Sequence, residues 1–174
     1  MAKMAEKLKK LFKTLAIEVF KFESRPEHAK YPESVQECID DDMKFKPEVY
    51  KVLDKFRQSQ PWRGTRGEMQ YKLRVLNEDL AGVYGIPQPQ LVFVEKFPVG
   101  ACCFPTSKPA VIMMEPETDG RYSVVCFLHE FGHALGKNEK ETCRWSINLF
   151  KRIFPKSFDN LEHKGHLLVR KVVK

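Results

Sequence analysis

The stretch from residue 124 to residue 136 constrains this chain more than any other, because it reads VVCFLHEFGHALG and contains the pattern His-Glu-x-x-His. An α-helix turns by about 100° per residue, so His129 and His133 project from one helix face. Their imidazoles can therefore bind one zinc ion. Glu130 lies beside that face, where a carboxylate can take a proton from a water molecule on the metal. The stretch predicts a helix with a zinc site.

The residues around the motif indicate a buried helix. Gly136 follows the second histidine by three positions, and glycine is the residue that most often ends a helix. The rest of the segment is apolar enough to pack on several sides. These apolar residues are Val124, Val125, Phe127, Leu128, Phe131, Ala134 and Leu135.

A zinc ion that activates water needs a third protein ligand and an open position. Asn138 is a good helix N-cap, and Glu141 three residues later completes a capping box, so a second helix is expected to begin here. Glu139 also falls in the first turn of this helix, six residues after His133. Glu139 is therefore the candidate third ligand, with Glu141 as the alternative.

Two further ligand sources stay open at this point. Cys143 lies on the same expected helix, but a soft thiolate suits a structural zinc site better than a water-activating one. A histidine elsewhere in the chain could also complete the ligand set. Each glutamate, in turn, has an ordinary role as a first-turn acid or capping residue.

The arrangement HEFGHALG followed by NEKETCRWS resembles the gluzincin metallopeptidases, in which a glutamate helix after the HExxH helix supplies the third zinc ligand. It is most similar to their smallest soluble members, the minigluzincins, and to the related ImmA-type regulatory peptidases with their ExEAxxFA pattern. That pattern favours Glu139 over Glu141. The resemblance covers roughly residues 65 to 154. It implies a zincin-like α+β fold, a Zn²⁺ cofactor and peptide-bond hydrolysis.

The spacing HExxHxxGxx(H/D) of the metzincins also fits if Glu139 takes the last place. However, the chain has no methionine after Met114, so the methionine turn of that group is missing. The metzincin assignment is therefore rejected.

Composition indicates an ordinary globular chain: 174 residues, of which 43% are hydrophobic and 30% charged. No apolar run approaches the ~20 residues of a membrane span, and no signal peptide is visible, so a cytoplasmic protein is expected. Five irregularly spaced cysteines favour reduced thiols. The net charge of +7 fits a soluble basic protein or one with an acidic partner, although no nucleic-acid motif is present.

Residues 1–63 are expected to form an N-terminal helical extension. Short helices are predicted at residues 34–39 and 48–58, with a connector at residues 62–67. Residues 3–22 predict a basic amphipathic helix, which suits core packing, a partner groove or an anionic membrane surface. Its apolar stripe consists of Met4, Leu8, Leu11, Phe12, Leu15, Val19 and Phe22, and its lysines are Lys3, Lys7, Lys9, Lys10 and Lys13.

We hypothesise that part of this extension is a pro-segment that covers the zinc site and keeps the enzyme latent. Thiolates and carboxylates both bind zinc, so Cys38 or one of Asp40, Asp41 and Asp42 could supply a blocking ligand. The ordinary alternative is a buried thiol followed by a solvated acidic loop.

Residues 64–154 are expected to form a minimal zincin catalytic domain. The pattern predicts a helix over residues 68–84 that ends at Gly85, then strands at residues 91–94, 101–104 and 110–114. The strand at residues 100–104 is the expected sheet edge, where an extended substrate could pair. The remaining residues 155–174 are expected to be a basic tail or helix. Candidates to stabilise an oxyanion are Tyr122, His163 and His166.

The sequence thus predicts a zinc-dependent metalloendopeptidase that acts on a protein or peptide. Glu130 would move the proton from water to the leaving amine, and His129, His133 and a glutamate would hold the metal. Two alternatives come from other classes: a regulatory protein that binds DNA or a repressor through a zincin fold, and a non-catalytic interaction protein stabilised by zinc. A purely structural zinc site would not need Glu130.

Overall fold

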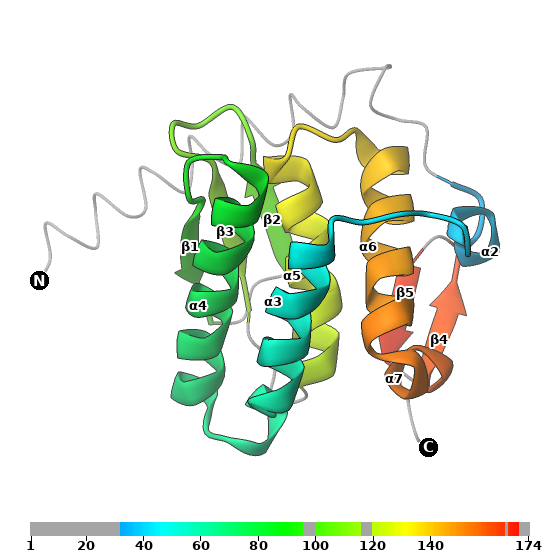
Figure 1. The fold of residues 1–174 in the computed structure, drawn as a ribbon, viewed down its shortest axis with the longest axis horizontal. Helices are drawn as coiled ribbons and strands as arrows, with labels where there is room; N and C mark the ends of the chain where they lie inside the picture. Colours follow the sequence, from blue (N-terminus) through cyan, green and yellow to red (C-terminus); the bar gives the residue numbers. More distant parts are fainter. Residues whose placement is uncertain (1–31, 96–99, 116–119, 166, 171–174) are drawn as a thin grey trace, which may run out of the picture.

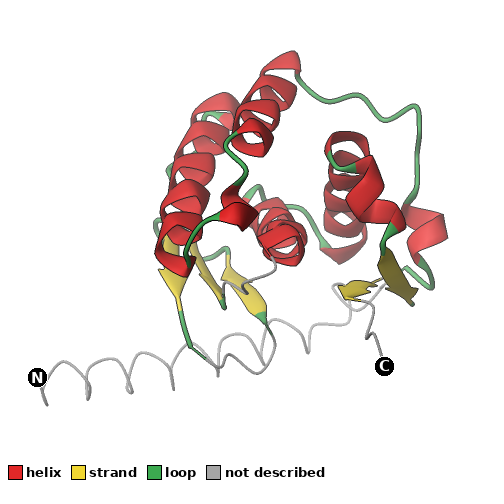
Figure 2. Ribbon diagram, turned by 90° about the horizontal axis from the view of Figure 1, so that it is seen from below, coloured by secondary structure: helices red, strands yellow, loops and turns green. Residues whose placement is uncertain are grey.

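A three-stranded mixed sheet lies at one side of the computed structural model, with the helices packed on one of its faces (Figures 1 and 2). The structure describes residues 32–95, 100–115, 120–165 and 167–170. The amphipathic helix expected at residues 3–22 and His166 lie outside the described residues. This architecture confirms the predicted α+β class with a small mixed sheet.

Four longer helices make up nearly half of the described chain. They are α3 (Pro47–Gln58), α4 (Arg66–Tyr84), α5 (Gly120–Ala134) and α6 (Glu139–Ile153). Three short helical segments accompany them, namely α2 (Val35–Cys38), η1 (Pro61–Arg63) and α7 (Pro155–Asp159). Within the described ranges, no helix combines the length and the apolarity needed to cross a membrane.

The sheet consists of β1 (Gln90–Phe93), β2 (Ala101–Phe104) and β3 (Val111–Met114) in the order β1-β3-β2. Strand β1 runs parallel to β3, and β2 runs antiparallel to it. The prediction that the strand ending at Phe104 forms an edge of the sheet is therefore confirmed. The prediction of three strands is also confirmed, with bounds that differ by one residue for β1 and β3.

Local signals fix the ends of helix α4 as the sequence predicts. Its N-cap Thr65 and Glu68 form a capping box, and this interaction starts the helix two residues earlier than the apolar pattern suggested. At the other end Gly85 adopts a left-handed conformation with φ of 66°, which is accessible to glycine without strain. The predicted helix and its stop at Gly85 are confirmed.

Residues 32–63, part of the expected N-terminal extension, pack into the same core as the rest of the described chain. Val49, Leu53 and Phe56 on α3 are at most 5% exposed and pack in one cluster with residues of α4, α5 and α6. Helix α2 contributes Val35 and Cys38 to that cluster. An amphipathic helix must bury its apolar stripe, and α3 buries its stripe against α4 (Figure 1).

The C-terminal segment, expected to be a basic tail or helix, begins with the short helix α7 and continues with two strands. After α7, strands β4 (Leu161–Lys164) and β5 (Leu167–Arg170) pair as an antiparallel hairpin. Gly165 begins the turn with φ of 58°, and its carbonyl accepts a hydrogen bond from the Val35 amide at 2.8 Å. Each of these strands has only four residues, which is too few to show a clear alternation of polar and apolar side chains. The available sequence signal for the hairpin was Gly165 between them.

We predict that α3 is required for the stability of the domain. Replacing the fully buried Leu53 with alanine should lower the free energy of unfolding by about 2–5 kcal/mol, because it leaves a cavity in the shared core. Urea unfolding should show a loss similar to that of Leu73→Ala on α4, whereas Lys51→Ala on the exposed face should stay within about 0.5 kcal/mol. A loss below 1 kcal/mol for Leu53→Ala would mean that α3 is a dispensable addition.

Candidate metal centre

Helices α5 and α6 bring together three side chains of types that can bind a metal. His129 and His133 lie one turn apart on α5, with their Nε2 atoms separated by 3.2 Å. Glu139, the first residue of α6, places Oε1 3.2 Å from Nε2 of His129 and Oε2 3.0 Å from Nε2 of His133. Two imidazole nitrogens and a carboxylate thus converge on one point.

The spacing of these donor atoms fits a tetrahedral zinc ion. Zinc binds histidine nitrogen and carboxylate oxygen at about 2.0–2.1 Å, so its tetrahedral ligand atoms stand about 3.3 Å apart. The two histidine nitrogens stand 3.2 Å apart, close to that value, and each of them has a carboxylate oxygen of Glu139 at 3.0–3.2 Å. The donor set of two imidazoles and one carboxylate is also that of water-activating zinc sites, which keep a fourth position open.

The turn after α5 orients the imidazole of His133. Gly136, with φ of 79°, donates its amide to the His133 carbonyl at 2.9 Å, and Lys137 donates to the Gly132 carbonyl at 3.2 Å. These two bonds form a Schellman motif, which ends the helix at the glycine. The same turn places the Lys137 carbonyl 3.2 Å from Nδ1 of His133. With Nδ1 held there, Nε2 is the nitrogen that faces Glu139.

Gly132 lets α6 approach α5 closely enough for Glu139 to reach the histidines. A Cβ atom at this position would stand 2.9 Å from Cγ2 of the fully buried Thr142 on α6. The sequence prediction did not assign a role to either residue. The available signal was a glycine in the interior of a helix, which costs stability and so indicates a packing requirement.

An aromatic cluster holds α6 in this position. The indole of Trp145 stacks on the ring of Phe131, with ring centroids 6.3 Å apart and an interplanar angle of 26°. Its Nε1 donates a hydrogen bond to the Tyr84 hydroxyl at 3.3 Å. Because Phe131 lies between the two histidines in sequence, this contact ties the motif helix to both α6 and α4.

The electrostatics of the cluster favour charge separation between the carboxylate and the imidazoles. Burial alone would raise the pKa of Glu139, but its hydrogen bonds to His129 and His133 outweigh that effect and hold the pKa well below its ordinary value. For His133, burial lowers the pKa, and the hydrogen bond to Glu139 with the charges of Glu130 and Glu139 raises it above 6.5 overall. The Glu139 carboxylate is therefore ionised.

Glu130 is buried beside the cluster, with 8% of its surface exposed. It lines a cavity of about 190 Å³ together with His129. Tyr122 lines this cavity too, whereas His163 packs on Phe158 with ring centroids 5.1 Å apart and is absent from the lining. The other walls are mainly apolar or carry thiols: Ala101, Val125, Cys126, Cys143, Ser146, Ile147 and Leu168.

Cys143 is a further neighbour of the cluster. Its Sγ lies 3.5 Å from Oε1 of Glu139, and one ligand atom each from His129, Glu139 and Cys143 fall within 4.8 Å of one another. Contacts with the Cys38 thiol, burial and the Glu139 charge raise the pKa of Cys143. The two histidine nitrogens lie 3.2 and 3.0 Å from Glu139, closer than the Cys143 sulfur at 3.5 Å. His133 is therefore a better candidate than Cys143 to join His129 and Glu139 as the third ligand.

The remaining candidates lie elsewhere. Glu141 is exposed, and it forms the predicted capping box with Asn138, so that local prediction is confirmed and the side chain is engaged away from the histidines. Asp40 pairs with Arg144 at 2.9 Å, and Asp41 pairs with Lys151 at 2.7 Å.

The proposed blocking ligands therefore do not take that position in the described chain. Cys38 is buried next to Cys143, with its thiol 3.6 Å from the Ser34 carbonyl. Neither Cys38 nor any of Asp40, Asp41 and Asp42 joins the metal-compatible group that the described residues form.

We predict that Gly132→Ala weakens metal binding by pushing α6 away. The clash with Thr142 should lower the free energy of unfolding by about 1–3 kcal/mol and reduce zinc affinity by about 10–100-fold. Chelator-competition titration and urea unfolding would measure the two effects.

The matched control is Gly82→Ala on α4, where a Cβ meets nothing within 4 Å. This control should gain roughly 0.5–1 kcal/mol and keep its zinc affinity. Equal zinc affinities for the two variants would contradict this account of Gly132.

Comparison with known protein families, with curated proteins and with solved structures found no match for this chain. The resemblance to gluzincins therefore remains a prediction from the residues of the motif helix and of α6. The function of the chain is inferred from the geometry of His129, Glu130, His133 and Glu139.

Proposed function

We propose that this chain is a zinc-dependent metallopeptidase of the gluzincin type. The observation that carries the proposal is the convergence of His129, His133 and Glu139 within 3.2 Å of one another, with Glu130 buried at their side. These three side chains would hold the ion. When bound, zinc would supply Lewis-acid polarisation of a substrate carbonyl and would activate water.

Glu130 is the proton carrier in this mechanism. It follows a ligand directly and lines the same cavity as His129, so its carboxylate can take a proton from water and deliver it to the leaving amine. The ligand Glu139 is a separate group, held by two histidines. Tyr122 lines the same cavity and lies two helical turns before His129. Among the described residues, it is the candidate that would donate a hydrogen bond to the oxyanion.

The edge strand β2 is the proposed place for an extended peptide substrate. Ala101, its first residue, lines the cavity next to His129 and Glu130. A peptide paired with this edge would be bound mainly through its backbone, and the apolar cavity would accept one aliphatic side chain. These features support a protein or peptide as the substrate.

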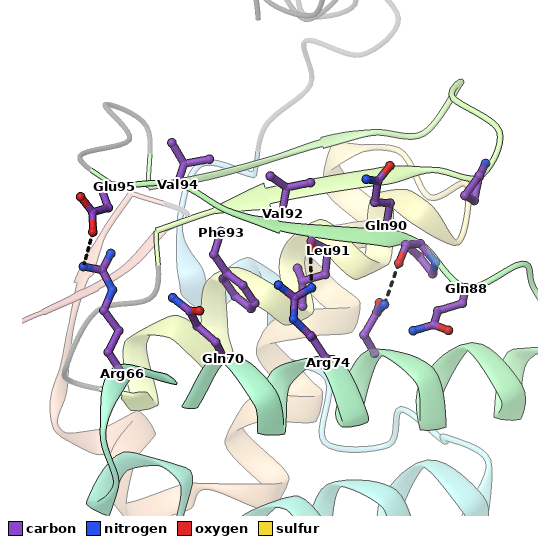
Figure 3. Close-up of a pocket in the computed structure, with 13 residues that line it drawn as sticks. Arg66, Gln70, Arg74, Gln88, Gln90, Leu91, Val92, Phe93, Val94 and Glu95 are labelled. Carbon is purple, nitrogen blue, oxygen red and sulfur yellow. Dashed lines mark hydrogen bonds and ion pairs between the residues drawn. The ribbon is translucent and has the colours of Figure 1, made fainter. Parts of the chain in front are cut away.

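The opposite edge of the sheet is less suited to such pairing (Figure 3). Along β1, Arg74 donates to the Leu91 carbonyl at 2.8 Å and Asn77 donates to the Pro89 carbonyl at 2.7 Å. Side chains of α4 thus occupy carbonyls that a paired strand would need. A larger cavity of about 800 Å³ lies between α4 and β1, but its lining includes no residue of the metal cluster.

A second candidate function is a non-catalytic zinc-stabilised protein, and the position of Cys143 favours it. With its sulfur 3.5 Å from Oε1 of Glu139, a Cys143 thiolate could occupy the fourth position and close the site. A closed site of this kind would contribute to folding and leave Glu130 without a chemical role. The two functions therefore predict different effects of changing Glu130.

The test compares metal content and peptide cleavage in the wild-type chain and in Glu130→Gln. The wild type should carry about one zinc per chain and cleave a peptide library, while Glu130→Gln should keep its zinc and lose roughly 10²–10⁴-fold in turnover. Elemental analysis and mass spectrometry of the library would measure both quantities.

Glu141→Gln is the matched control, because this glutamate is exposed and away from the histidines. It should keep both zinc and activity. Cleavage by Glu130→Gln at the wild-type rate would remove Glu130 from the mechanism. Zinc binding without any cleavage by the wild type would favour the closed structural site.

A further inference from the structure

The face of the sheet that points away from the helices is apolar. On this outer face, Val92, Met113 and Cys102 form one row across the three strands, because the register pairs Val92 and Cys102 with Met113. The outer face is defined by six side chains that form their own hydrophobic cluster: Val92, Val94, Cys102, Phe104, Val111 and Met113.

The sequence of β3 indicates that both faces of the sheet are covered. Strand β3 reads Val-Ile-Met-Met without alternation, and such continuous apolar runs are typical of strands buried on both sides. Ile112 and Met114 face the main core and are fully buried. Met113 and Phe104 on the outer face are only 3% and 5% exposed.

The described helices do not provide this second cover. In Figure 2 they lie on one side of the three strands. Figure 3 shows Phe93 directed toward α4, whereas Val92 and Val94 point to the opposite side. The partner of the outer face must therefore come from another part of the chain or from another molecule.

We propose that residues 3–22 dock on the outer face through their apolar stripe. This stretch has seven large apolar residues at helical spacing and lysines on the remaining surface, which is the pattern of a helix that covers an apolar surface. A helix of twenty residues is about 30 Å long, enough to cross three strands that stand about 4.8 Å apart. Residues 23–31 can span about 30 Å when extended, which gives the connection its reach.

Segment length favours residues 3–22 over the other stretches of the chain that lie outside the described ranges. Apart from residues 1–31, the stretches outside the described ranges are residues 96–99, 116–119, 166 and 171–174. None of these exceeds four residues, so none is long enough to cover the six side chains of the outer face.

The proposal places the segment across the sheet from the metal cluster. Cys103, next to Cys102 in sequence, has its side chain on the inner face, where burial and the charge of Glu130 raise the pKa of its thiol. Residues 3–22 would then stabilise the sheet without blocking the site. This inference does not depend on the proposed peptidase activity.

Cys102 on the outer face allows a direct test in the full chain. We expect the double variant Leu8→Glu/Leu15→Glu to increase the rate of Cys102 alkylation by N-ethylmaleimide at least tenfold, as measured by peptide mass spectrometry. The buried thiols of Cys38 and Cys143 should stay protected in the same sample, which checks that the domain is folded. The control Lys9→Gln/Lys13→Gln should leave the Cys102 rate unchanged.

A second measurement locates the contact. With cysteine introduced singly at Leu11, Leu15 or Val19, mild oxidation should cross-link at least one of these positions to Cys102, whereas Lys13→Cys should not cross-link. Equal Cys102 rates in all variants together with no cross-link would overturn the proposal. Cys102 protection that requires phosphatidylserine vesicles would overturn it in favour of a lipid surface, and protection that rises with protein concentration would overturn it in favour of a second copy.

Discussion

The close contact between α5 and α6 is the constraint on which the candidate site depends. Two histidines one turn apart on a helix offer only two ligands, and the third must come from another element. The chain supplies it by reversing at Gly136 and starting α6 at Glu139, while Gly132 and Thr142 let the helices approach. Trp145 then fixes α6 by stacking on Phe131. The packing of the two helices and the arrangement of the candidate ligands are thus set by the same few residues.

The same contact explains the charge balance of the cluster. A carboxylate that is only 15% exposed pays a desolvation cost unless it is paired. In the described chain, His129 and His133 provide that pairing, and a bound cation would provide it with the imidazoles neutral. The cavity beside the cluster has apolar walls such as Val125 and Ile147, and a low local dielectric strengthens such interactions. A carboxylate, two imidazoles and a second buried acid form a costly set for a core and a useful one for metal chemistry.

Sequence reasoning predicted the parts of this structure that local signals determine. The capping box at Asn138, the helix ended by Gly85 and the three strands follow from short-range rules, and the structure agrees with them. Tertiary features were harder to predict. The packing of Leu53 into the shared core, the hairpin at Gly165 and the neighbourhood of Cys38 and Cys143 depend on contacts between residues far apart in the chain. The choice between Glu139 and Glu141 likewise depended on which first-turn carboxylate faces α5, and spacing alone does not decide that.

The central claim is that the cluster binds zinc through two imidazoles and a carboxylate with one position left open. X-ray absorption spectroscopy of the zinc-loaded chain tests it most directly, with Cys143→Ser as the comparison. The account predicts a first shell of nitrogen and oxygen at about 2.0–2.1 Å with imidazole scattering, unchanged in Cys143→Ser. A sulfur ligand at about 2.3 Å that disappears in this variant would contradict the open site, and a chain that takes up no zinc would contradict the metal centre itself.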